Sequence, residues 1–169
     1  MQSVYAKMVQ QSRIPYFYSD LEVADTLEGR YDLLVIHAFI VMRKLKKYPE
    51  QTDMFAQSLW DLMFADMDTG LREMGFGDMG VARRVPKMAE AFYGRVIAYE
   101  DGLAVTENDK LIEALDRNLY RKTPVKAESL ATMAEYLRKE SDHVMAQNHN
   151  DILLGHITFN SPTLTSGSE

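Results

Sequence analysis

The chain has 169 residues, no cysteine and a formal net charge of −6, with 46% hydrophobic and 26% charged residues. This length and balance predict one globular domain with a single core, and they exclude a disulfide framework, thiolate chemistry and cysteine-based metal sites. The acidic balance also argues against binding DNA through bulk charge, although it is compatible with a local basic patch.

Helical periodicity runs through the whole chain, and no pair of alternating strands joined by a tight turn is evident. The helices expected from this periodicity cover, in chain order, residues 4–11, 26–47, 52–73, 78–100, 108–120 and 123–148. A short aromatic segment lies at 16–18, and an extended segment, LLGHITF, follows the last helix. The predicted fold class is therefore all-α, a single-domain bundle of about six helices with a short extended C-terminal segment and a disordered tail at 160–169.

The second expected helix, 26–47, is apolar on nearly every face, which is typical of a helix buried at the centre of a bundle. Its longest apolar run, Leu33–Met42, is too short to span a bilayer, which needs about 20 apolar residues. The N-terminal stretch, Met1–Tyr18, has the character of neither a signal peptide nor a transit peptide. We therefore expect a soluble, intracellular protein.

Prolines mark two of the expected helix boundaries. Pro49 should stop the second helix after the cationic sequence RKLKK. Pro86 removes the amide bond back to Ala82, so we expect a kink or a restart of the fourth helix near Val85.

Capping signals mark the last two helices. Thr106 and Asp109 have the spacing of a capping box at the start of the fifth helix. Thr123 should cap the sixth helix, with Pro124 at its first position.

The sequence MGFGDMG at 74–80 contains the spacing G-x-G-x-x-G, which is the fingerprint of a dinucleotide-binding turn. That turn requires a preceding strand, whereas an amphipathic helix precedes these glycines. The favoured interpretation is a helix–helix joint, with Gly75 as the C-cap, Gly77 in the turn and Asp78 as the next N-cap.

Carboxylates crowd the same region, and they offer a second candidate site, because hard cations bind clusters of oxygen ligands. Five of them surround one arginine, Arg72: Asp61, Asp66, Asp68, Glu73 and Asp78. Asp66 lies well round the helix from Asp61 and Asp68, so a solvated acidic face is the favoured interpretation over a metal site.

Glu140 and His143 form one E-x-x-H pair, whereas di-iron bundles use two such pairs and two further glutamates. His37 lies in the apolar second helix and is interpreted as a core histidine with a hydrogen bond. No metal, cofactor or catalytic residue is assigned from these histidines. The rival hypothesis of a metal- or haem-binding helical enzyme depends on His37, Glu140 and His143.

Methionine is abundant, with 11 in the chain, and five of them cluster at Met63, Met67, Met74, Met79 and Met88. Methionine suits surfaces that accept varied apolar partners, although core filling is favoured for the first three of these. A basic group follows at Arg83, Arg84 and Lys87, and it is either a solvated face or a site for acidic protein, lipid or RNA.

The middle of the chain resembles the ubiquinol–cytochrome c chaperone family. The sequences DLMFADMD, LREMG and MAEAFYGR, within Leu59–Leu103, carry this resemblance, and Tyr31–Leu45 looks like the helix that precedes them in the family. The resemblance implies that residues 1–159 form a chaperone-like helical domain, and that the protein is an assembly factor with no cofactor rather than an enzyme.

The resemblance also implies partners and a location. The client would be nascent cytochrome b, on its way into the ubiquinol–cytochrome c reductase complex (respiratory complex III). A partner assembly factor or the ribosome would be further contacts. The chain is similar to the bacterial form, which implies the cytoplasm, with peripheral contact at the cytoplasmic face of the inner membrane and no contact with DNA.

We expect the client to bind on a surface formed by the third and fourth helices, because chaperoning an apolar helix requires adaptable apolar surface with a polar rim. The predicted partner-binding residues are Asp66, Asp68, Met79, Arg83, Arg84, Lys87 and Tyr93. Reversal of charge at Arg83 and Arg84 should weaken capture of cytochrome b and leave the fold intact. The rival from another class is a general interaction scaffold with no tie to cytochrome b.

Overall fold

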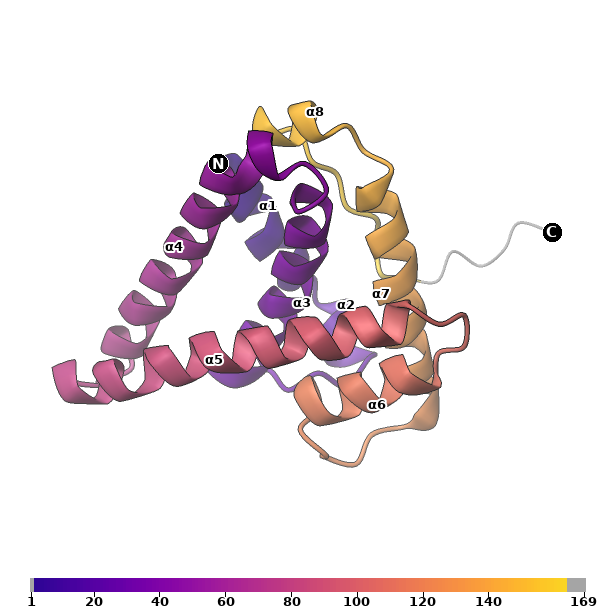
Figure 1. Cartoon of the computed structure of the whole chain (residues 1–169). Coiled ribbons are helices and arrows are strands. Elements are labelled where there is room, and N and C mark those ends of the chain that lie inside the picture. Colours follow the sequence, from indigo (N-terminus) through magenta and orange to yellow (C-terminus); the bar gives the residue numbers. More distant parts are fainter. Residues whose placement is uncertain (1, 164–169) are drawn as a thin grey trace.

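The computed structural model describes residues 2–163, which form eight helices and no strand (Figure 1). Six helices have ten or more residues, which confirms the all-α prediction, and two are shorter. Their bounds are α1 Gln2–Ser12, α2 Tyr16–Ser19, α3 Leu27–Leu45, α4 Pro49–Glu73, α5 Asp78–Leu103, α6 Asp109–Asn118, α7 Ala127–Met145 and α8 His149–Leu153.

Helix α3 is the centre of the bundle and packs against α1, α4 and α7. Residues 31–41 of this helix are all buried, as its uniformly apolar sequence predicts. The helix begins where Thr26 accepts a hydrogen bond from the amide of Gly29 at 3.1 Å. It ends at Leu45, and Pro49 begins α4 at its first turn, where a proline has no amide bond to lose.

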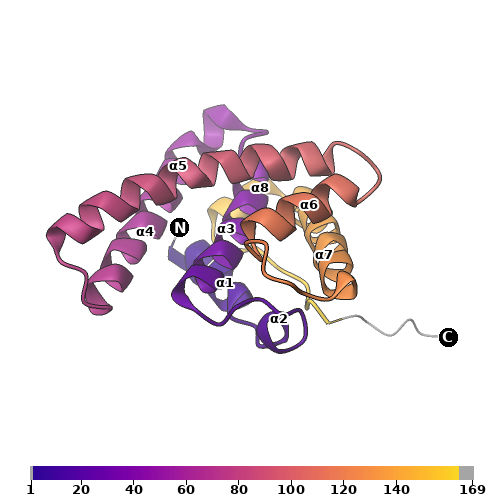
Figure 2. The ribbon, with the colours of Figure 1, turned by 90° about the horizontal axis from the view of Figure 1, so that it is seen from below.

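Helices α4 and α5 form a long hairpin, and its turn lies at the end of the molecule farthest from α6 and α7 in both ribbon views (Figures 1 and 2). The turn closes α4 with a Schellman motif, in which the amide of Phe76 donates to Leu71 and that of Gly75 donates to Arg72. Gly75 has a φ of +97°, which explains the glycine there. Because the turn joins two helices, the predicted joint is confirmed. Its caps differ from those predicted, since Met74 rather than Gly75 is the C-cap of α4 and Gly77 rather than Asp78 is the N-cap of α5.

Two of the predicted helix starts are wrong, and so is one of the two alternatives at Pro86. Of the kink or restart expected near Val85, the restart does not occur, because α5 continues through Pro86 as one helix. Ala82, whose carbonyl loses its helical partner, is exposed to water. At the start of α6, Asn108 is the N-cap and no side chain caps the helix, so the capping box of Thr106 and Asp109 does not form.

Helix α7 begins at Ala127, three residues after Pro124, and Thr123 is not its cap. A carboxylate from a distant part of the chain serves this end instead. Glu22 accepts hydrogen bonds of 2.8 Å from the Lys126 amide and from the Ser129 hydroxyl. The Lys126 amide, and then the Ser129 hydroxyl, lower the pKa of the Glu22 carboxyl because they stabilise its charged form.

A buried polar network ties the extended C-terminal segment to the core. His37 is fully buried, and its Nδ1 lies 2.9 Å from the Leu33 carbonyl while its Nε2 lies 2.8 Å from the Tyr136 hydroxyl. Gln11 donates to that hydroxyl and to the Asn160 carbonyl. Residues 160–163 of the predicted tail are thus described, and residues 164–169 lie outside the described part of the chain.

Within residues 2–163, no helix combines the length and the apolar character needed to cross a membrane.

Candidate functional site

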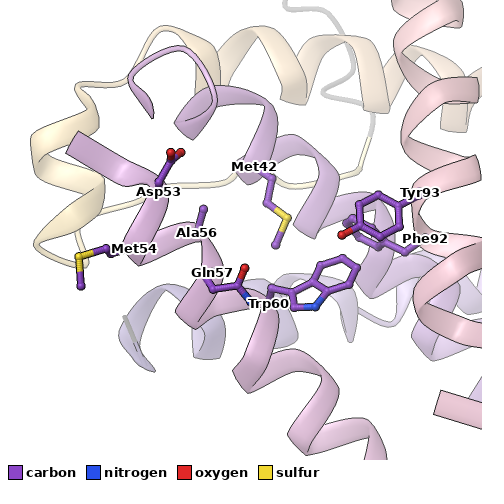
Figure 3. Close-up of a pocket in the computed structure, with 8 residues that line it drawn as sticks. All are labelled: Met42, Asp53, Met54, Ala56, Gln57, Trp60, Phe92 and Tyr93. Atoms are coloured by element: carbon purple, nitrogen blue, oxygen red, sulfur yellow. The ribbon is translucent and has the colours of Figure 1, made fainter. Parts of the chain in front are cut away.

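Two grooves flank the α4–α5 hairpin, and the first, here called the aromatic groove, lies between α3, α4 and α5 (Figure 3). Its volume is about 530 Å³, within the range of ligand pockets. Three helices supply its lining: Met42 from α3, then Asp53, Met54, Ala56, Gln57 and Trp60 from α4, and Phe92 and Tyr93 from α5.

The wall of the aromatic groove is a cluster of rings centred on Trp60. The indole lies 4.8 Å from the ring of Phe92, edge to face, and 5.2 Å from the ring of Tyr93. Phe92 is buried and holds the cluster against the core, whereas Tyr93 is 62% exposed and Met54 is 86% exposed. Large exposed apolar side chains gathered beside a hollow make the aromatic groove a candidate binding surface.

The second groove, here called the basic groove, lies on the side of the hairpin that faces the N-terminal end of α3. Its volume is about 630 Å³. Apolar side chains cover much of its lining: Leu27, Tyr31, Leu71, Met74, Phe76, Met88 and Ala91. Four cations and one carboxylate complete it: Arg84, Lys87, Arg95, Arg121 and Glu28.

Two of these cations share one carboxylate beneath the basic groove, that of Asp32, which is almost completely buried. Arg95 donates to its Oδ1 at 2.6 Å, and Arg121 donates to its Oδ2 at 2.7 Å. Burial raises the pKa of the Asp32 carboxyl, while the hydrogen bonds and charges of Arg121 and Arg95 oppose that change. The contact with Asp32 raises the pKa of the Arg121 guanidinium in turn. This cluster fixes α3 to α5 at the floor of the groove.

The predicted partner-binding residues lie on different faces of the hairpin rather than on one continuous surface. Tyr93 lines the aromatic groove, and Arg84 and Lys87 line the basic groove. Asp66 faces α1, where it accepts a hydrogen bond from the Tyr5 hydroxyl. That contact raises the pKa of Tyr5, although burial contributes more to the change.

The remaining three predicted residues lie towards the turn. Asp68 accepts from Arg72 at 2.7 Å, and the same guanidinium also binds Asp78. Met79 is 72% exposed and Arg83 is exposed. The carboxylates of this end of the hairpin are therefore partly committed to Arg72.

Several residues of the two grooves do not stand out in the sequence. Met42, Met54 and Gln57 of the aromatic groove belong to helices whose relative placement no local pattern gives. Trp60 is recognisable as part of the apolar stripe of α4, but a stripe is ordinarily read as core. The one available signal is the adjacent pair Phe92 and Tyr93, since neighbours on a helix cannot share the buried face.

The rival metal or haem site depends on His37, Glu140 and His143, and the structure gives each of them a different protein partner. His37 is bonded to Leu33 and Tyr136 as described above. Glu140 accepts from the amide of Asn160 at 2.8 Å, and His143 lies 3.1 Å from the Thr158 hydroxyl. Within residues 2–163, no group of three or more histidine or acidic side chains is arranged to hold a metal ion.

The comparisons with known proteins agree with one another. A family model described as ubiquinol-cytochrome C chaperone matches residues 19–159. The chain is 31% identical to a protein whose solved structure is described as the Cbp3 homolog from Brucella abortus, with a TM-score of 0.85, covering 95% of this chain and 88% of that one.

Two curated relatives are more distant. Ubiquinol-cytochrome c reductase complex assembly factor 1 of Mus musculus is 20% identical over 151 residues, which cover 89% of this chain and 51% of that protein. Protein CBP3, mitochondrial, of Saccharomyces cerevisiae is 29% identical over 108 residues, which cover 62% of this chain and 32% of that protein. The chain thus spans about half of the length of the first relative and about a third of the second.

Proposed function

Because the chain belongs to the ubiquinol-cytochrome c chaperone family, we propose that it is an assembly factor for the ubiquinol–cytochrome c reductase complex. Its client is newly synthesised cytochrome b. The relative from Mus musculus supports the proposal because its name is that of an assembly factor for this complex.

The observation that carries the proposal is the aromatic groove. Trp60 and Tyr93 present large, partly exposed rings, and Met42 and Met54 add flexible thioethers that adjust to the shape of an apolar partner. A transmembrane segment before insertion is an apolar helix, and an apolar helix is recognised by lying in an apolar groove. Asp53 and Gln57 at the edge of the groove provide the polar rim.

The function proposed is binding and not catalysis. Chaperoning requires that a client is held and released, so the groove needs exposed apolar area and no group that attacks a bond. A partner assembly factor or the ribosome is a further contact in this proposal, and the site of action is the cytoplasmic face of a bacterial inner membrane, where cytochrome b is inserted.

The test is capture of cytochrome b during its synthesis in a cell-free translation reaction that contains the purified full chain. Replacement of Trp60 and Tyr93 by alanine removes two rings of the groove, and each buried aromatic contact contributes about 1 kcal/mol beyond its burial. We expect capture to fall by at least about tenfold for the double variant. Met145→Ala, at the C-terminal end of α7 and outside the groove lining, is the control and should capture as the wild type does.

Two outcomes would overturn the proposal. One is undiminished capture by the double variant, provided that its circular dichroism shows an intact fold. The other is equal capture of an unrelated membrane protein of similar apolar content, which would favour a general interaction scaffold with no tie to cytochrome b.

A further inference from the structure

The end of the α4–α5 hairpin projects from the bundle (Figures 1 and 2). It carries exposed apolar side chains. Met74 is 58% exposed and Met79 is 72% exposed, and Phe76 is half-buried between them in the chain. Met74 and Phe76 also line the outer end of the basic groove, and Met79 lies outside it. A projecting end with exposed apolar side chains can enter a layer of lipid headgroups.

Cations stand directly behind this apolar end, on the first turns of α5. Arg83, Arg84 and Lys87 are all exposed, and no carboxylate among residues 2–163 forms an ion pair with any of them. The guanidinium of Arg84 lies 4.1 Å from the centre of the Phe76 ring, so the cation and the apolar side chain form one unit.

The side chains of Asp68, Glu73, Asp78 and Arg72 at the same end carry a combined charge of −2 against the +3 of these cations, which leaves an excess of one positive charge. Arg72 binds both Asp68 and Asp78, which leaves Glu73 as the acidic residue of the turn without an ion pair in the described part of the chain. The chain as a whole carries a net charge of −6. An anionic surface therefore repels most of the molecule and attracts the three cations, which orients the molecule with this end forward.

We propose that the hairpin tip, defined as Met74, Phe76, Met79, Arg83, Arg84 and Lys87, docks on an anionic lipid surface. The two methionines and the phenylalanine enter the headgroup layer, and the three cations lie against the lipid phosphates. The inference rests on the proposed function in one respect, because docking by the tip would bring the aromatic groove close to the membrane into which the client is inserted.

The lipid surface is favoured over an acidic protein partner by the separation of the two grooves and by the position of the cations at a projecting end of the molecule. An apolar protein segment has the aromatic groove available, and the lining of that groove contains no cation and one carboxylate, Asp53. The cations lie on the other side of the hairpin, in the basic groove and at the tip.

The experiment is co-sedimentation of the full chain with vesicles of phosphatidylcholine alone and of equal parts phosphatidylcholine and phosphatidylglycerol. Each cation near an anionic surface strengthens binding by about fivefold. The variant Arg84→Gln/Lys87→Gln should therefore bind the anionic vesicles on the order of 20-fold more weakly. The matched control, Lys46→Gln/Lys47→Gln, removes two exposed cations at the opposite end of α4 and should bind as the wild type does.

A second variant, Met74→Ser/Met79→Ser, tests the apolar contribution and should also weaken binding, without any change of charge. Equal binding to both kinds of vesicle, or equal weakening in the control variant, would overturn the proposal. So would binding of an acidic apolar peptide by the tip together with no binding of vesicles, since that outcome assigns the tip to a protein partner.

The two proposals fail separately. If the wild type captures cytochrome b but does not bind anionic vesicles, the lipid-docking inference alone is overturned. Loss of capture in the Trp60 and Tyr93 variant is expected to leave vesicle binding unchanged, and no capture by the wild type would overturn the proposed function alone.

Discussion

The buried histidine of α3 makes the stability of the fold depend on pH. His37 is completely buried, and its Nδ1 donates to the Leu33 carbonyl, so its Nε2 accepts from the Tyr136 hydroxyl. Burial lowers the pKa of His37 from 6.5 to about 4, and the hydrogen bond to Leu33 opposes this change. The folded state thus keeps the neutral ring at a pH where the unfolded chain already binds a proton.

The sign and size of the effect follow from this difference. As the pH falls below 6.5, the unfolded state binds a proton and the folded state does not, so the free energy of unfolding decreases until the pH reaches about 4. Between pH 6.5 and pH 4 the free energy of unfolding falls by about 3 kcal/mol in total. Between pH 8 and pH 5 it falls by about 2 kcal/mol.

Urea unfolding, followed by circular dichroism at the two pH values, measures this loss. His37→Gln should be less stable than the wild type at pH 8, because Tyr136 loses its partner, but it should lose about 2 kcal/mol less between pH 8 and pH 5. Other groups titrate equally in both proteins and cancel in the comparison. His143→Gln is the matched control and should follow the wild type. Equal losses in the wild type and in His37→Gln would refute the reasoning.

Two further predictions concern packing and charge. A Cβ at Gly102 would lie 2.9 Å from the Cα of Leu111, so Gly102→Ala should force α5 from α6 and cost about 1–3 kcal/mol in urea unfolding. Gly94→Ala in the same helix meets no atom within 4 Å and should stabilise by about 0.5–1 kcal/mol, and a cost for both would contradict the account. Asp32→Ala leaves Arg95 nearly buried without its carboxylate and should cost about 3 kcal/mol, whereas a loss below about 1 kcal/mol would mean that Arg95 finds water or another partner.

Local chemistry in the sequence predicts much of the fold. The apolar run of α3 predicts a central helix, and the helix begins within one residue of the expected start. The glycine at 75 is needed because the residue after the C-cap of α4 has a positive φ, and that requirement is local.

The wrong start of α7 has a tertiary origin, since a distant residue replaces the expected local signal. Helix α7 begins near Lys126 because Glu22, about a hundred residues earlier in the chain, binds the amide there. Thr123 and Pro124 form a good local start, but a tertiary contact decides the position.

The candidate site was less predictable than the fold. The adjacent pair Phe92 and Tyr93 indicates that one of the two rings is exposed. The aromatic groove also requires Met42 and Trp60 to come together from two other helices, and no spacing in the sequence predicts that contact. The predicted charged rim was assembled from one stretch of chain, and its members face different sides of the hairpin because successive residues of a helix point in different directions.

The most direct test of the account is assembly of the reductase in cells of the source organism that lack this gene. The amount of assembled ubiquinol–cytochrome c reductase is measured on native gels after complementation with the wild type or with Trp60→Ala/Tyr93→Ala. The account predicts that deletion lowers the amount of the complex, that the wild type restores it, and that the folded double variant does not. An unchanged amount of complex after deletion, or full restoration by the double variant, would contradict it.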